Sequence, residues 1–286
     1  SFPPFLALCA YSMVGADLEV VNPDGDDQTD NANGTAEWKR AGTDRRNMSE
    51  EAQSFWSQIS QMVGADVTSL LSVPVFIMEP TTVLQKMAEI MEYPELLSKA
   101  ANSSEPAERM AYVTAFCVSV YASSERTWKP FNPILGETFH LDIGEDGYYL
   151  AEQVSHHPPI GVAHAENSEW EYDIVSCPKT KFLGNSLEVY PVGRTRVKLK
   201  TFGEVISLVP PTSKAYNLVL GRMWVDSFGT MQLNNTNGWK CKLEFVPCGW
   251  LGSSRYTLKG NIYDPEGKAV LYLDGKWNGG LGFRQC

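Results

Sequence analysis

The chain has 286 residues, of which 43% are hydrophobic and 20% are charged, so its composition is that of a folded protein and excludes a disordered tail or a coiled coil. Its 34 acidic residues outnumber its 24 lysines and arginines, and the net charge of -10 argues against broad nucleic-acid binding, which needs a basic face. The longest nearly apolar stretch, residues 111–122, is shorter than the roughly 18 residues of a membrane-spanning helix, which excludes such a span.

The N-terminal part of the chain is acidic and poor in large apolar residues. Residues 1–52 hold ten acids and four bases, and the sequence Asn-Pro-Asp-Gly at 22–25 favours a turn. We therefore expect an irregular N-terminal segment over 1–47 and a folded domain over 48–286.

Apolar residues at helical spacing predict helices in the first part of this domain. One helix is expected over 49–63, ending at Gly64, a second starts at Pro80, and a short third starts at Pro94. A longer helix is expected over 106–123. Its buried stripe is predicted to consist of Met110, Val113, Cys117, Val120 and Tyr121.

From Lys129 onward the sequence indicates β-structure. Runs of β-branched and aromatic residues recur about every 8–12 residues and are separated by Gly, Pro, Asn or Asp. These runs are 137–142, 148–153, 169–175, 195–201, 205–209 and 256–263. Helices followed by strands predict the α+β class, with a large antiparallel sheet arranged as a sandwich or a barrel.

The alternation in 195–201 predicts that the sheet has one dry face and one wet face. Val197 and Leu199 are expected to point toward an apolar interior, and Arg196, Lys198 and Lys200 toward water. The pattern leaves open whether side chains fill that interior or leave a cavity. The six scattered cysteines include no C-x-x-C pair, so neither a cysteine metal site nor a disulfide framework is expected.

The most unusual string is Glu-Gln-Val-Ser-His-His-Pro-Pro at 152–159, which places two of the four histidines next to each other. Pro158 restricts His157 toward an extended conformation. The two prolines are expected to end any strand and to stiffen the turn.

Three interpretations of His156 and His157 are open. They bond backbone groups at a strand end, or they bind a metal with a third ligand such as Glu152 or His140, or both donate to an anion such as a phosphate. A metal site is the weaker alternative, because adjacent strand residues point to opposite faces unless the turn re-aims them.

A second string, Lys-Pro-Phe-Asn-Pro-Ile-Leu-Gly-Glu, occupies 129–137. Lys129 is a compact cation beside a proline, Asn132 precedes another proline, and Gly136 allows close backbone approach. The string is either part of a binding site or a proline-rich connector between the helices and the sheet.

Together the two strings resemble the ligand-binding domain of the oxysterol-binding protein-related family, and the string at 152–159 is that family's fingerprint. The similarity covers roughly residues 50–278 and includes the segment 71–80 and Gly-Lys-Trp at 275–277. Within the family the chain is similar to the short plant-type members.

The resemblance implies a lipid-binding and transfer protein rather than an enzyme, with no metal and no cofactor. It implies an incomplete antiparallel β-barrel around a hydrophobic tunnel, which takes up a sterol or phosphatidylinositol 4-phosphate and exchanges them between membranes. The positions that match the family's headgroup site are Lys129, Asn132, His156 and His157, and Phe131 matches a position at the tunnel entrance. The implied location is the cytosol, with transient contact to membrane surfaces.

The family pattern also divides the domain into a helical part over 48–125 and a barrel over 126–286, and it implies that a C-terminal subdomain is missing. Residues 278–286 are therefore expected to be a foreign or truncated ending, and 1–47 a remnant of the lid region. Two rival functions remain. One is a non-transferring relative that acts as a lipid sensor or a partner-binding module, and the other is a metal-dependent phosphoesterase using His156, His157 and Glu152.

Overall fold

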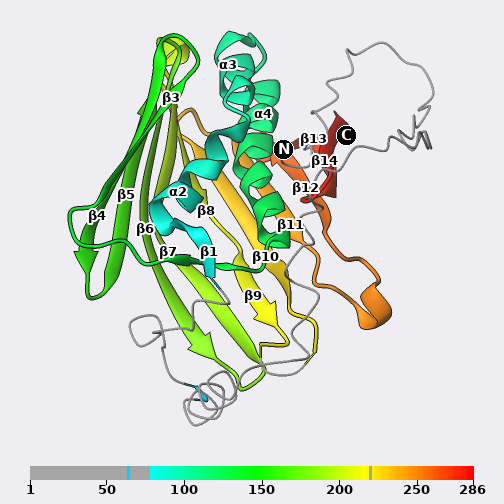
Figure 1. The fold of residues 1–286 in the computed structure, drawn as a ribbon. Helices are drawn as coiled ribbons and strands as arrows, with labels where there is room; N and C mark the ends of the chain where they lie inside the picture. Colours follow the sequence, from blue (N-terminus) through cyan, green and yellow to red (C-terminus); the bar gives the residue numbers. More distant parts are fainter. Residues whose placement is uncertain (1–62, 65–77, 219–220) are drawn as a thin grey trace, which may run out of the picture.

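The computed structural model describes residues 63–64, 78–218 and 221–286 (Figure 1). The expected irregular segment 1–47, the segment 71–77 and all but the last residue of the helix expected over 49–63 lie outside the described residues. The boundary expected at residue 48 therefore stays a prediction. Val63 and Gly64 form a turn in which Gly64 has a φ of 89°, a conformation that suits glycine.

In the described part of the chain the helices come early and the strands follow. The helical elements are α2 (Val83–Ala88), the 3₁₀ helix η3 (Glu89–Glu92), α3 (Glu95–Asn102), α4 (Pro106–Ser119) and three further 3₁₀ helices, η4 (Val120–Glu125), η5 (Lys200–Phe202) and η6 (Trp250–Gly252). The strands are β1 (Met78–Thr82), β2 (Lys129–Phe131), β3 (Thr138–Ile143), β4 (Gly147–His156), β5 (Pro159–Glu166), β6 (Trp170–Phe182), β7 (Ser186–Leu199), β8 (Glu204–Val209), β9 (Thr212–Tyr216), β10 (Trp224–Asn235), β11 (Lys240–Phe245), β12 (Thr257–Tyr263), β13 (Ala269–Lys276) and β14 (Gly280–Gln285). No described helix has both the length and the apolar character needed to cross a membrane.

Strands β3 to β14 form one 12-stranded sheet whose neighbouring strands are all antiparallel. Its order is β14-β13-β12-β11-β10-β8-β7-β6-β5-β4-β3, and β9 pairs with both β10 and β7. Between its two end strands, β3 and β14, no pairing is found within the described residues. The sheet curves around α3 and α4 (Figure 1), which confirms the expected α+β class and incomplete barrel.

Helix α4 lies along the inner face of the sheet, where it contacts β11, β12 and β13 (Figure 1). From Arg109 to Ser119 every residue except Tyr112 is buried, so the predicted stripe was too narrow there. The helix expected to reach 123 ends at Ser119, and Val120 and Tyr121, predicted as the end of the buried stripe, lie in η4 and are only half-buried. A helix that is enclosed by a curved sheet buries most of its circumference, and a sequence pattern does not reveal that enclosure. Cys117 of α4 and Cys241 of β11 are buried in this core as free thiols, and burial raises the pKa of each to about 12.

The start of α2 differs from the prediction. Pro80 lies inside β1, and the helix begins at Val83, after Thr82 donates its backbone N–H to Gln85 Oε1 at 2.8 Å. A proline is tolerated in this strand because β1 pairs with only one described neighbour, the parallel strand β2. The expected helix starts near Pro94 and at Pro106 are confirmed.

The final residues form an integral part of the sheet, so the expectation of a foreign ending over 278–286 is wrong, and the expected truncation stays a prediction. Strand β14 pairs with β13 from Lys276↔Gly280 to Leu271↔Gln285. Trp277 and Leu281 are buried, and Phe283 meets Tyr112 of α4 edge to face, with ring centroids 6.3 Å apart. The apolar residues at alternate positions were the signal for this strand.

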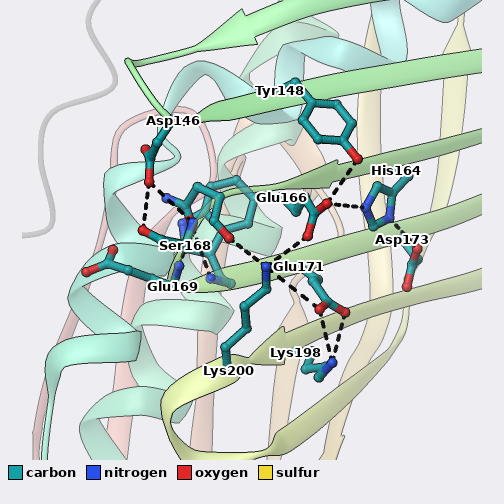
Figure 2. A network of polar contacts seen from close by, with 12 residues as sticks. Asp146, Tyr148, His164, Glu166, Ser168, Glu169, Glu171, Asp173, Lys198 and Lys200 are labelled. Carbon is teal, nitrogen blue, oxygen red and sulfur yellow. Dashed lines mark hydrogen bonds and ion pairs between the residues drawn. The ribbon is translucent and has the colours of Figure 1, made fainter.

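The outer face of β4 to β7 carries a ladder of charged side chains (Figure 2). Lys198 Nζ lies 3.0 Å from Glu171 Oε1, and Lys200 Nζ lies 2.8 Å from Glu166 Oε2. Val197 and Leu199 are buried on the opposite face, as the alternation predicted. Exposed ion pairs of this kind contribute little to stability, and they keep the outer face of the sheet polar and in contact with water.

One ion pair is buried instead, and it joins the start of α4 to β8. Arg109 Nε and Nη2 donate to the two carboxylate oxygens of Glu204 at 3.2 and 2.5 Å, and Arg109 Nη1 donates to the carbonyls of Ser103 and Ser104. Asn235 and Asn237 each donate to Glu204 at 2.9 Å. Both charges are therefore fully hydrogen-bonded, which a buried pair requires.

We expect Glu204→Gln to destabilise the fold by about 3 kcal/mol, because it leaves the Arg109 guanidinium buried without its counter-charge. The measurement is urea-induced unfolding. The matched control, Glu171→Gln, removes a partner of Lys198 on the outer face and should cost less than about 1 kcal/mol. Equal losses in the two variants would contradict the assignment.

The same carboxyl makes stability depend on pH. Burial alone would raise the pKa of Glu204, but hydrogen bonds from Arg109 and Asn235 outweigh it and hold the pKa below 4.5. A carboxyl with a lowered folded pKa stabilises the fold above its unfolded value, and that stability is lost as the pH falls through the folded value. The difference in unfolding free energy between wild type and Glu204→Gln should therefore shrink as the pH drops below 4.5. A constant difference across this range would show that the charge plays no part.

Candidate functional site

The two histidines lie where β4 turns into β5. Strand β4 ends at His156, which pairs with Pro159, and the pairing register shifts between Gln153 and Ser155. This β-bulge leaves one extra residue on β4 and re-aims the side chains that follow it. Ser155 Oγ closes the turn by donating to the Pro158 carbonyl at 2.7 Å.

The turn brings the two imidazoles together on the surface. Both His156 and His157 are exposed, and their ring centroids lie 4.7 Å apart with the planes at 75°. The two prolines were expected to end any strand, and β4 does end just before them, at His156, while Pro159 is already the first residue of β5. A proline is tolerated at the first position of a strand, because the backbone N–H that it lacks is not needed for pairing inside the sheet.

The described residues include no group of three His, Cys, Asp or Glu side chains that could hold a metal ion. His140 lies on β3 beside Asp142, with 3.8 Å between Nε2 and Oδ1, and its ring is next to Tyr148. Among the residues that the structure describes, no third ligand for a metal at His156 and His157 is in place.

Lys129 and Asn132 form the second pair. Lys129 Nζ donates to Asn132 Oδ1 at 3.0 Å and to the Pro130 carbonyl at 3.1 Å. Burial lowers the pKa of this ammonium, and no salt bridge to a carboxylate is found for it in the described part of the chain. Lys129 is thus a partly desolvated cation held by neutral acceptors, an arrangement that favours binding of an anion.

The two pairs are connected through Gln153. The Gly136 N–H donates to the Gln153 carbonyl at 2.9 Å, and the Gln153 N–H donates to the Glu137 carbonyl at 3.0 Å. Gly136 makes this turn with a φ of 78°, which favours glycine. The segment that carries Lys129 and Asn132 is thereby fastened to β4 three residues before His156.

Apolar side chains are exposed along these same segments. Phe131 is 40% exposed, Ile134 72% and Leu135 65%, and Val154 in the bulge is 44% exposed. Large exposed apolar groups next to a cation and two imidazoles give the site an amphipathic character. The position of Phe131 at a tunnel entrance stays a prediction.

Sequence reasoning named the polar groups but missed Gln153, Ile134 and Leu135. Gln153 is 2% exposed, and its side-chain Nε2 donates to the Ser155 carbonyl at 2.7 Å, so it supports the turn from below. Its place in the alternation of β4, between outward-pointing Glu152 and Val154, was the available signal.

Comparison with known proteins places these features in a family. The family model described as oxysterol-binding protein matches residues 54–286. Oxysterol-binding protein-related protein 3B of Arabidopsis thaliana is 47% identical over 273 residues, which is 94% of this chain and 57% of the relative. The chain thus spans little more than half the length of that relative.

Solved structures agree with the sequence match. The ORD domain of Osh1 in complex with cholesterol has a TM-score of 0.75 and 32% identity, over 86% of this chain and 58% of that one. The ORD of Osh3 from Saccharomyces cerevisiae, in complex with PI(4)P, has a TM-score of 0.71 and 31% identity, over 80% of this chain and 62% of that one.

The similarity in sequence extends over most of the chain, and the curved sheet with its helices has the same arrangement in the solved structures. Both confirm the resemblance that the strings at 129–137 and 152–159 indicate. The chain belongs to the oxysterol-binding protein family.

Proposed function

We propose that the protein binds either a sterol or phosphatidylinositol 4-phosphate and moves these lipids between membranes, working in the cytosol at membrane surfaces. The observation that carries the proposal is the pairing of two sets of hydrogen-bond donors, Lys129 with Asn132 and His156 with His157, on segments joined through Gln153. Relatives solved with cholesterol and with PI(4)P support this pair of ligands.

The polar groups suit a phosphorylated inositol. An ammonium, two imidazoles and an amide supply several donors, and charge-assisted hydrogen bonds to phosphate are the stronger kind. Lys129 is half-buried, and this partial desolvation lowers its pKa, so it gains more from an anion than a fully hydrated lysine would. The stiff Ser155–Pro158 turn reduces the ordering entropy that binding costs.

Binding of a sterol must be driven by burial of its apolar surface rather than by these polar contacts. A sterol of about 28 heavy atoms, at roughly -0.3 kcal/mol per atom, gives about -8 kcal/mol. That free energy corresponds to a dissociation constant of about 1 μM. Binding of this strength is tight enough to take a sterol out of a membrane and weak enough to release it. We propose that the sterol lies against the inner face of the sheet away from β11, β12 and β13, the strands that α4 covers, and that catalysis plays no part.

The function is tested by measuring transfer. Donor vesicles carrying a fluorescent sterol, and acceptor vesicles carrying phosphatidylinositol 4-phosphate, are mixed with the protein, and movement of each lipid is followed. We expect both lipids to move, and each to be found by mass spectrometry in the protein recovered from the mixture. Lipid bound without movement would favour the lipid-sensor alternative, and no bound lipid would overturn the proposal.

The double variant His156→Ala/His157→Ala should reduce extraction of phosphatidylinositol 4-phosphate by about 100-fold, because two donors to the phosphate are lost at roughly 1.5 kcal/mol each. Sterol uptake should stay within about two-fold of wild type, since the imidazoles do not contact the sterol in this proposal.

The matched control is His140→Ala, which removes another exposed histidine, from β3. It should leave the extraction of both lipids unchanged. Loss of both lipids in the double variant would show that the histidines serve folding, and unchanged phosphoinositide extraction would remove them from the site.

A further inference from the structure

The loop between β11 and β12 exposes a tryptophan. Trp250 is 88% exposed, more than any other large hydrophobic residue in the described part of the chain. It lies in η6, on a loop that projects away from the sheet (Figure 1). A free indole in water is unfavourable, whereas at a membrane–water boundary its apolar body and its N–H are both accommodated.

The turn that carries Trp250 is closed by its own hydrogen bonds. The Gly249 N–H donates to the Ser253 carbonyl at 2.7 Å, and Ser253 Oγ donates to the Trp250 carbonyl at 3.1 Å. A Cβ on Gly249 would lie 2.4 Å from Ser253 Oγ and 3.2 Å from the Ser253 carbonyl oxygen, so the two residues approach each other closely across the turn. The indole is therefore held outward by a preformed turn, and little ordering is needed when it meets a partner.

Two arginines lie beside this loop. Arg222 and Arg255 are exposed and line a cavity of about 710 Å³ between η4, β10 and the β11–β12 loop. The Arg255 guanidinium is held over the rings of Trp224, at 5.2 Å, and Tyr256, at 4.5 Å. Neither arginine forms a salt bridge with any carboxylate in the described ranges.

Two acids are near these cations. Glu125 lines the same cavity and accepts a hydrogen bond from Asn278 Nδ2 at 2.8 Å. Asp226 is 1% exposed and accepts the Cys248 N–H at 2.8 Å. Burial raises the pKa of Asp226, and the nearby Arg255 guanidinium partly offsets that rise, so Arg255 is in reach of this buried carboxyl. The cavity rim thus carries two positively charged guanidiniums and one exposed carboxylate, whereas the chain as a whole has a net charge of -10. A locally cationic rim on an acidic protein selects an anionic partner.

We propose that Trp250, Arg222 and Arg255 form an anchor for an anionic phospholipid surface. The indole enters the headgroup layer, and the two guanidiniums bind lipid phosphates at the mouth of the cavity. The cavity wall also includes Thr127, two residues before Lys129. The anchor rests on the proposed function and gives it a docking surface.

The test measures binding to vesicles of phosphatidylcholine and phosphatidylserine that contain no sterol and no phosphoinositide. We expect the wild-type protein to sediment with them and Trp250→Ala to bind about 10-fold more weakly. Arg222→Gln with Arg255→Gln should weaken binding about 25-fold at low salt, at about five-fold for each guanidinium, and less at high salt. The matched control is Lys240→Gln, an exposed lysine at the opposite end of β11.

A second readout locates the indole. Brominated phospholipids should quench part of the fluorescence of the wild-type protein, and that part should be missing in Trp250→Phe. Vesicle binding that is unchanged in Trp250→Ala, or a loss equally large in Lys240→Gln, would overturn the anchor. So would a Trp250→Ala variant that loses only self-association, since Trp250 would then contact a second copy of the chain.

The anchor and the proposed function can fail separately. The variant His156→Ala/His157→Ala should bind these vesicles as wild type does, because the headgroup site is not used. Trp250→Ala should still take up sterol delivered from cyclodextrin, without a membrane. A protein that docks on vesicles but binds no lipid would retain the anchor and lose the proposed function.

Discussion

A buried ion pair, Arg109 with Glu204, ties the start of α4 to the sheet, and its burial requires that both charges be fully paired. Both oxygens of Glu204 and all three nitrogens of the guanidinium are hydrogen-bonded, and the Phe202 ring lies 3.9 Å from the Arg109 Cζ. The pair joins the start of α4 to β8, and the residues that follow run along the inside of the sheet, where they contact β11, β12 and β13. Helix α4 continues through η4 toward β2, where pairing with β1 holds the strand that begins at Lys129.

The candidate site shows why two separate strings in the sequence behave as one unit. The backbone of Gln153 pairs with Gly136 and Glu137, so the proline-rich segment cannot move independently of β4. The side chain of Gln153 meanwhile supports the turn through Ser155. Gln153 therefore links the segment of Lys129 and Asn132 to the turn of His156 and His157. Neither string contains this link by itself, so each string alone is also compatible with a connector or a strand end.

Features that depend only on neighbouring residues could be predicted from the sequence. Features that depend on contacts within the assembled sheet could not. The alternation at Val197 and Leu199 and the helix start at Pro106 depend on neighbouring residues alone, and both were predicted. The position of Pro80 in a strand depends on pairing with β2, about 50 residues later in the chain. Likewise, the burial of α4 around its circumference depends on β11 to β13 closing over it. The bulge before Ser155 arises from the offset between β4 and β5, for which one strand's sequence contains no signal.

The buried thiols of Cys117 and Cys241 have a practical consequence for spectroscopic work. Only the thiolate attacks maleimides and related reagents, and a pKa of about 12 leaves almost none of it at neutral pH. Both thiols are also sealed in the core, so a native sample should not be modified there. Cys286, exposed at the end of β14, is by contrast an accessible attachment point for a dye or a spin label on the opposite edge of the sheet from β3.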